Sequence, residues 1–166
     1  MAEVATELMG VVEDLREMSR GIHPEMLSRA GLRPALRALG RRSAVPVEMD
    51  VRVAGRLPEA VEVAAYYLVS EMLANATKHA RASVVNVEAQ SSVGTLRVRV
   101  RDDGVGGADL ARGSGLVGLQ DRIEALGGTF SVHSPVGRGT TVTCELPVMA
   151  GGRHPDAHPG QQPAPA

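Results

Sequence analysis

Aromatic side chains are scarce in this chain of 166 residues, which has two tyrosines, one phenylalanine and no tryptophan. Proteins that hold single-stranded nucleic acid stack its bases on such side chains, so the composition argues against that function. Long apolar runs are also missing, because none approaches the roughly 20 residues that cross a bilayer. The N-terminus lacks the pattern of a secretory signal peptide. We therefore expect this chain to be cytoplasmic, while a parent protein is free to be anchored in a membrane elsewhere.

Excess charge of either sign is absent as well. Eighteen Lys and Arg face nineteen Asp and Glu, a net charge of −1, so nothing attracts the whole molecule to nucleic acid or to an anionic membrane. Any bound anion must be held by a local site. The only cysteine, Cys144, has no partner for an internal disulfide. It lies in an apolar, strand-like stretch, which predicts a buried structural thiol in a reducing compartment.

Three regions differ in pattern. Residues 1–23 carry apolar side chains at alternating spacings of three and four residues, at Met1, Val4, Leu8, Val11, Leu15, Met18 and Ile22. This is the seam of a coiled coil or helical bundle, although an ordinary amphipathic helix packed on its own domain remains an alternative. Residues 24–148 have the composition of one globular domain. Residues 149–166 are rich in Pro, Gly and Gln, and we expect them to be disordered.

The globular region mixes helical and strand periodicities. In chain order it predicts two short helices over 25–43, a strand at 45–53, a long helix over 58–80, strands near 85–89 and 96–100, a helix over 116–126, and strands at 129–134 and 139–147. In the strand near 96–100, Leu96, Val98 and Val100 should face inward. Regular strand–helix–strand alternation is missing, which favours an α+β sandwich of two layers, with helices on one face of a sheet.

The long helix carries the first candidate site residues. Glu71, Asn75 and Lys78 lie four and three residues apart and therefore share one helix face. A carboxylate, an amide and an ammonium in one row can activate an imidazole, ligate Mg²⁺ through oxygen and hold a phosphate. Taken by itself, this pattern is also compatible with a solvent-exposed helix face that has no function.

Three glycine-rich stretches follow. Residues 102–107 (DDGVGG) come directly after a strand, where a carboxylate can accept a hydrogen bond from an exocyclic amine. Residues 113–118 (GSGLVG) open a helix, whose first N–H groups can bind phosphate. They also spell the dinucleotide fingerprint, but the preceding strand ends about ten residues too early for that fold. Residues 137–141 form a tight turn before the last strand. Each stretch by itself is compatible with an ordinary turn.

Together the four motifs resemble the ATP-binding fold shared by histidine kinases, type II topoisomerases, Hsp90 chaperones and MutL. Glu71 and Asn75 are similar to its N box, residues 103–106 to its G1 box and residues 113–116 to its G2 box. Within this superfamily the chain resembles the DesK/NarL-like class of sensor histidine kinases. The carriers of that resemblance are residues 71–82 (EMLANATKHARA), 20–24 (RGIHP) with Gly31-Leu32, 115–122 (GLVGLQDR) and Gly139-Thr140. The resemblance covers about residues 1–147.

The resemblance implies a mixed sheet of the Bergerat type and a role for each motif. Asp103, in a loop with Gly104 and Gly106, would bind the adenine amino group. Asn75 would ligate Mg²⁺, and Glu71 would polarise or deprotonate an acceptor histidine. The remaining contacts to ATP would come from Lys78, His79, Gly113, Ser114, Gly115, Leu116 and Thr140. Residues 108–114 would form a short lid.

The phosphate acceptor is the one part of the pattern that does not match. Acceptor histidines in this class are followed by an acidic residue in an early helix, and none of His23, His79, His133, His154 and His158 fits. We therefore expect the chain either to begin inside the second dimerisation helix of a homodimeric kinase, where a monomeric and a dimeric fragment are both compatible with three heptads, or to lack an acceptor of its own. Its partners would be the acceptor domain and a response regulator, with no nucleic acid. A nucleotide-binding interaction module or an anti-sigma-type serine kinase relative is the alternative, which the N-terminal heptad seam disfavours.

Overall fold

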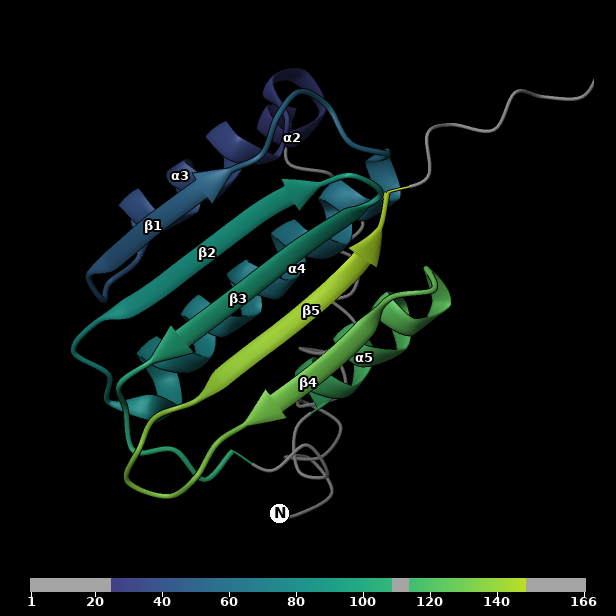
Figure 1. Cartoon of the computed structure of the whole chain (residues 1–166). Coiled ribbons are helices and arrows are strands. Elements are labelled where there is room, and N and C mark those ends of the chain that lie inside the picture. The colour runs from purple at the N-terminus through teal and green to yellow at the C-terminus, as the bar shows by residue number, and fades with distance from the viewer. Residues whose placement is uncertain (1–24, 109–113, 149–166) are drawn as a thin grey trace, which may run out of the picture.

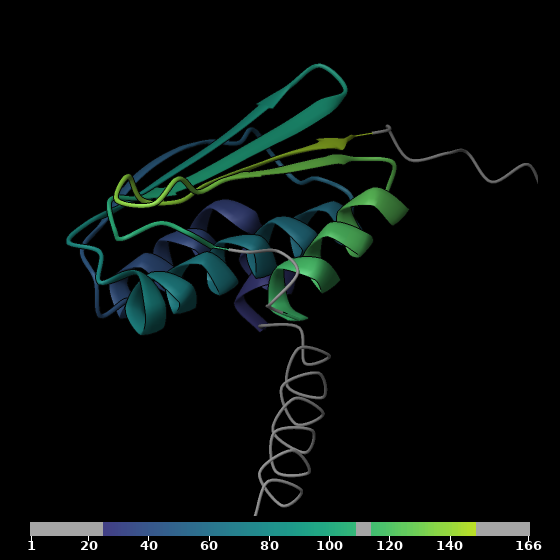
Figure 2. The same ribbon diagram turned by 90° about the horizontal axis from the view of Figure 1, so that it is seen from below.

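The computed structural model describes residues 25–108 and 114–148. These residues form two layers, a five-stranded sheet and a set of helices that all cover one of its faces (Figures 1 and 2). The predicted α+β sandwich is thereby confirmed. The helix predicted over residues 1–23 and the disorder predicted for 149–166 lie outside the described residues.

The sheet is mixed. Its strands are β1 (Val47–Arg52), β2 (Val85–Ser92), β3 (Thr95–Asp102), β4 (Thr129–His133) and β5 (Thr141–Pro147). They lie in the order β1-β2-β3-β5-β4, and only the β1–β2 pair is parallel. This order makes β3 and β5 neighbours, so the end of β3 lies beside the start of β5.

One face of the sheet is apolar and the other polar, as strand alternation dictates. In β3 the side chains of Leu96, Val98 and Val100 are fully buried, while the arginines between them are exposed, as predicted. In β5 the inward side chains are Val142, Cys144 and Leu146. Cys144 is a free thiol with 1% of its surface exposed, which confirms that it is buried.

The helical layer consists of α2 (Glu25–Ala30), α3 (Leu32–Arg42), α4 (Glu59–Asn75) and α5 (Ser114–Ala125). Helix α4 runs under the middle of the sheet (Figure 1), and Ala64, Ala65, Leu68 and Val69 are its most deeply buried residues. Helix α5 packs beside it, where the Arg122 guanidinium lies 5.3 Å from the centre of the Tyr67 ring. No helix in the described part of the chain is long and apolar enough to cross a membrane.

The long helix predicted over 58–80 has the expected extent but two different parts. After Asn75 the α-helix changes into a π-helical segment, η1 (Ala76–Ala80). The residue that follows it, Arg81, has a left-handed φ of 51°. A π-helix has wider turns than an α-helix and is often found at functional sites. Here it begins directly after a candidate magnesium ligand.

Candidate functional site

The four sequence motifs lie at one end of the sheet. The loop after β3 is fastened to the end of η1, because the Val105 N–H donates to the carbonyl oxygen of Ala80 at 2.8 Å. The same loop holds the β4–β5 turn, because the Gly137 N–H donates to the Val105 carbonyl oxygen at 2.6 Å. Gly104 is needed for this approach, since a Cβ there would collide with the Ala80 carbonyl group. The loop after β3, the π-helix and the last turn therefore form one connected wall.

The start of α5 lies against α4. A Cβ on Gly115 would collide with the carboxylate of Glu71, so the absence of a side chain lets this carboxylate approach the first turn of α5. The first N–H groups of a helix have no partner within the helix and carry part of its positive macrodipole. The fold thus places a candidate base beside a candidate phosphate-binding helix end.

The other residues predicted on this helix face differ in exposure. Asn75, the last residue of α4, is half-buried, whereas Lys78 and His79 in η1 are exposed. Thr77 donates its hydroxyl to the Leu73 carbonyl oxygen at 2.9 Å, which closes the turn around Asn75.

Asp102 is the buried carboxylate at the end of β3, with 2% of its surface exposed. Its Oδ1 accepts the N–H of Gly104 at 2.9 Å and the N–H of Thr140 at 3.2 Å. Its Oδ2 receives no hydrogen bond from the residues that the structure describes. The carboxylate is therefore fixed in position through Oδ1, while Oδ2 has no donor among the described residues.

Asp103, which the sequence analysis chose for the adenine contact, points the other way. Its side chain is exposed, and it accepts the Ser83 N–H at 2.7 Å, the Val84 N–H at 3.1 Å and the Ser83 hydroxyl. The Ser83 hydroxyl, followed by the two backbone N–H groups, holds the pKa of Asp103 below its usual value. Both oxygens of Asp103 are thus engaged in fixing the turn between η1 and β2.

Thr140 completes the wall from the opposite side. It is buried, and it makes two hydrogen bonds with Asp102, because its N–H donates to the Asp102 carboxylate and its carbonyl oxygen accepts the Asp102 N–H at 2.9 Å. Its Oγ1 lies 2.8 Å from Oγ of Ser134, a residue that no sequence motif singled out. The predicted contact residue Thr140 is therefore adjacent to Asp102 and supported by a second hydroxyl.

The remaining predicted residues contribute through the backbone or are not described. Gly113 and the side chain of Ser114 lie outside the described residues. Leu116 has only 8% of its surface exposed, so its side chain belongs to the core and only its N–H can face a ligand. Gly106 adopts a φ of 64° in the loop after β3.

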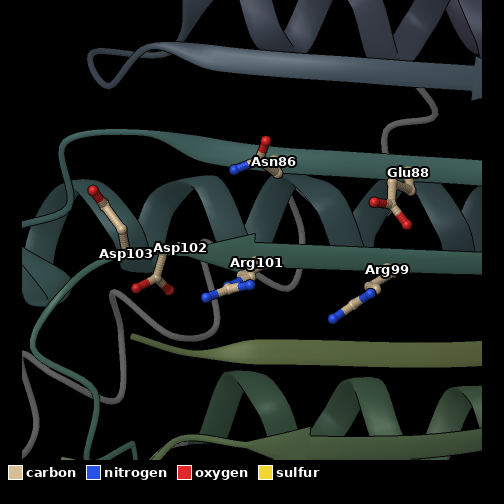
Figure 3. Close-up of a pocket in the computed structure, with 6 residues that line it drawn as sticks. All are labelled: Asn86, Glu88, Arg99, Arg101, Asp102 and Asp103. Atoms are coloured by element: carbon tan, nitrogen blue, oxygen red, sulfur yellow. The ribbon is translucent and has the colours of Figure 1, made fainter. Parts of the chain in front are cut away.

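Of two surface hollows, one shares Asp102 and Asp103 with this wall and the other lies away from it. One, of about 320 Å³, is lined on the outer face of the sheet by Asn86 and Glu88 of β2 and by Arg99, Arg101, Asp102 and Asp103 (Figure 3). The other, of about 610 Å³, is lined by Met26, Ala30, Arg33, Pro34, Arg37 and Arg41 of α2 and α3. Neither includes Glu71, Asn75 or Thr140, so neither is the site that the motifs build.

Comparison with known proteins identifies the kind of site. Residues 60–150 match the family described as histidine kinase-, DNA gyrase B-, and HSP90-like ATPase. The chain is 32% identical to the oxygen sensor histidine kinase NreB of Staphylococcus carnosus over 147 residues, which cover 83% of this chain and 42% of NreB. It is also 32% identical to the sensor histidine kinase NarS of Mycobacterium tuberculosis over 152 residues, 85% of this chain and 35% of NarS. The chain thus spans about two fifths of these curated relatives.

Solved structures agree with this placement. The histidine kinase domain of the blue-light activated histidine kinase from Erythrobacter litoralis is 30% identical, with a TM-score of 0.56 over 69% of this chain and 57% of that one. The ATP binding domain of PrrB from Mycobacterium tuberculosis is 23% identical, with a TM-score of 0.53 over 72% of this chain and 92% of that one. At that identity the second likeness supports the fold alone.

Proposed function

Because the chain belongs to the family of histidine kinase-, DNA gyrase B-, and HSP90-like ATPases, we propose that it binds ATP and transfers the γ-phosphate to a histidine. The acceptor would lie outside this sequence, on a dimerisation domain of the full-length kinase, and a response regulator would take the phosphate onward. The observation that carries the proposal is the contact between Glu71 and the first turn of α5. It supports a carboxylate base beside a helix end that would bind phosphate, while Asp102 and Thr140, bonded to each other, would form the adenine end of the site.

The adenine end belongs to Asp102 in this proposal, in place of Asp103. An adenine amino group is a hydrogen-bond donor, so it requires an acceptor that is held in position and has a lone pair available. Asp102 meets both conditions, since Oδ1 is held by two backbone N–H groups and Oδ2 takes no bond from the described residues. Asp103 meets neither, because Ser83 and Val84 occupy its oxygens at the protein surface.

The phosphate end belongs to the start of α5. The N–H groups of Gly115 and Leu116, with Gly113 and Ser114 before them, would bind the β- and γ-phosphates as helix N-termini commonly do. Lys78 and His79, exposed in η1, would contact the phosphates, and the Lys78 ammonium would add positive charge. Phosphoryl transfer depends mainly on such positioning and charge neutralisation.

A magnesium ion fits the residues present as one shared with the substrate. Among the described residues no group of three or more His, Cys, Asp and Glu is placed to hold a metal, so a cage made by protein side chains alone is not formed there. Mg²⁺ is commonly held by one or two protein oxygens together with substrate phosphates. The amide oxygen of Asn75 would be the protein ligand, and the bound ion would neutralise phosphate charge.

Glu71 would act on the acceptor imidazole. In the transfer, a bond forms between the imidazole nitrogen and the γ-phosphorus, the bond from that phosphorus to the β–γ bridging oxygen breaks, and ADP leaves with the electron pair. The Glu71 carboxylate would polarise the imidazole by accepting a hydrogen bond from the N–H of the other ring nitrogen, and would take that proton as the nitrogen–phosphorus bond forms.

The proposal is tested by adding radiolabelled ATP and magnesium to this chain and a histidine-bearing dimerisation domain from a similar kinase. We expect label on the histidine of that domain, lost in acid and stable in alkali, and none on the chain by itself. Asn75→Ala should abolish the labelling, whereas Asn86→Ala on the outer face of β2 should preserve it. Acid-stable label on a serine would instead support the anti-sigma-type alternative. A wild-type chain that binds no ATP in titration calorimetry would contradict the proposed function itself.

A further inference from the structure

Ser134 joins two parts of the nucleotide wall. It follows directly after β4 and is half-buried. Its carbonyl oxygen accepts the N–H of Gly107 at 2.9 Å, and its Oγ accepts the N–H of Ala108 at 2.9 Å. These two bonds hold Ser134 against the glycine loop after β3, so the position of its hydroxyl is fixed by the backbone on both sides.

The hydroxyl of Ser134 also lies 2.8 Å from Oγ1 of the buried Thr140. A serine hydroxyl has one proton and two lone pairs. One lone pair of Ser134 is taken by the Ala108 N–H, and within the described residues Thr140 Oγ1 is the acceptor within hydrogen-bond distance of its proton, in a pair where either oxygen can donate. A partly buried hydroxyl is costly to leave without an acceptor. Donation from Ser134 to Thr140 gives the Ser134 proton an acceptor inside the protein, which favours this direction of the bond.

This direction of the bond decides what Thr140 can do. Once Oγ1 of Thr140 accepts from Ser134, its own proton points elsewhere and is available to a bound molecule. The backbone of Thr140 is already fixed, because it exchanges hydrogen bonds with Asp102 through its N–H at 3.2 Å and its carbonyl oxygen at 2.9 Å. Only the hydroxyl orientation is left to be set, and Ser134 is the group that sets it.

We propose that Ser134 is a positioning residue for nucleotide binding, which orients the Thr140 hydroxyl so that it donates a hydrogen bond to a ring nitrogen of the adenine bound beside Asp102. The inference rests on the proposed function, since it requires a nucleotide beside Asp102 and Thr140. Ser134 does not touch the nucleotide. Its effect passes through Thr140 and adds to the rigidity that functional side chains gain from supporting hydrogen bonds.

A double-mutant cycle with ADP and titration calorimetry tests the coupling. Ser134→Ala should weaken ADP binding about fivefold, the effect of one ordinary hydrogen bond. In a Thr140→Val background, where no hydroxyl is present to orient, the same change should alter affinity by less than about twofold. Ser134→Thr keeps the hydroxyl and should restore wild-type affinity. Ser131→Ala, an exposed serine in β4, is the matched control and should have no effect.

The outcomes distinguish the positioning role of Ser134 from the proposed function of the chain. A fivefold loss that persists in the Thr140→Val background would overturn the positioning role, because Ser134 would then act through general stability. Unchanged affinity of Ser134→Ala would overturn it as well. If Ser134→Ala does not fold, Ser134→Cys fills the same space with a weak donor and carries the same comparison. Failure of the wild-type chain to bind ADP would contradict the proposed function instead.

Discussion

Asp102 and Asp103 are neighbours in the sequence and have opposite environments at the end of β3. Asp102 is buried and fixed by two backbone N–H groups, whereas Asp103 is exposed and bonded to Ser83 and Val84. The sequence contained the signal for this difference. The inward alternation of Leu96, Val98 and Val100 continues to position 102, so a carboxylate there must turn toward the helices. The match of Asp103 to a short motif outweighed that alternation in the sequence interpretation.

Asparagine substitutions at both positions distinguish the two aspartates. Asp102→Asn should weaken ADP binding at least tenfold, about 1.4 kcal/mol. The amide oxygen can still accept the bonds from Gly104 and Thr140, but an NH₂ group replaces Oδ2 and faces the adenine amine as a second donor. Asp103→Asn should change the affinity by less than about twofold. Titration calorimetry measures both constants, and a larger loss for Asp103→Asn would return the adenine contact to that residue.

At the scale of elements, the sequence predicted the helices and strands better than the geometry of their ends. Two short helices around Gly31, the long helix and all five strands lie where the periodicities put them. The π-helical segment Ala76–Ala80 was not predicted. A run of small and polar residues has the same composition in an α- or a π-helical turn, so only the contact of Ala80 with the loop after β3 distinguishes the two.

Two glycines of α5 provide a matched test of the contact between α5 and α4. A Cβ on Gly115 would collide with the Glu71 carboxylate, whereas a Cβ on Gly118 would meet nothing within 4 Å. Gly115→Ala should lower the rate of phosphotransfer in trans by about tenfold to a hundredfold, because a shift of about 1 Å in a catalytic group has effects of that size. ADP affinity should change less, because Asp102 and Thr140 are untouched.

Gly118→Ala is the control for the helix itself. It should leave phosphotransfer unchanged and raise the free energy of unfolding by about 0.5–1 kcal/mol, as alanine does in place of glycine inside a helix. Phosphotransfer is measured by radiolabel and stability by urea denaturation. Equal effects of the two substitutions on phosphotransfer would show that the approach of Glu71 to α5 has no part in catalysis.

At the scale of the whole molecule, the strand order assembles the site. Asp102 and Thr140 lie far apart in the sequence, and the wall forms because β5 inserts between β3 and β4. The start of β5 is thereby brought beside the end of β3, where Thr140 meets Asp102. Sequence motifs identified most members of this wall, but no periodicity encodes which strand lies next to which. Ser134 was missed for that reason, since its importance exists only once β4 and β5 are paired.

The same central position makes Cys144 a probe of global unfolding. It lies in β5 between Val98 of β3 and Phe130 of β4, and burial raises the pKa of its thiol to about 12 from 9.0. Only the thiolate reacts readily, so at pH 8 a thiol reagent should modify the folded chain only through molecules that open the sheet. The labelling rate should rise with urea in proportion to the unfolded fraction. Rapid labelling without urea would show instead that β4 and β5 separate locally.

The raised pKa of Cys144 also fixes a pH dependence. A thiol whose pKa is higher in the folded state stabilises that state fully below pH 9, and this contribution disappears as the pH rises from 9.0 toward about 12. Cys144→Ala lacks the ionisable group, so its free energy of unfolding should fall less steeply over that interval than that of the wild type. Urea denaturation at stepped pH values measures the two slopes. Equal slopes would mean that Cys144 reaches solvent in the native sheet, which would contradict its burial between β3 and β4.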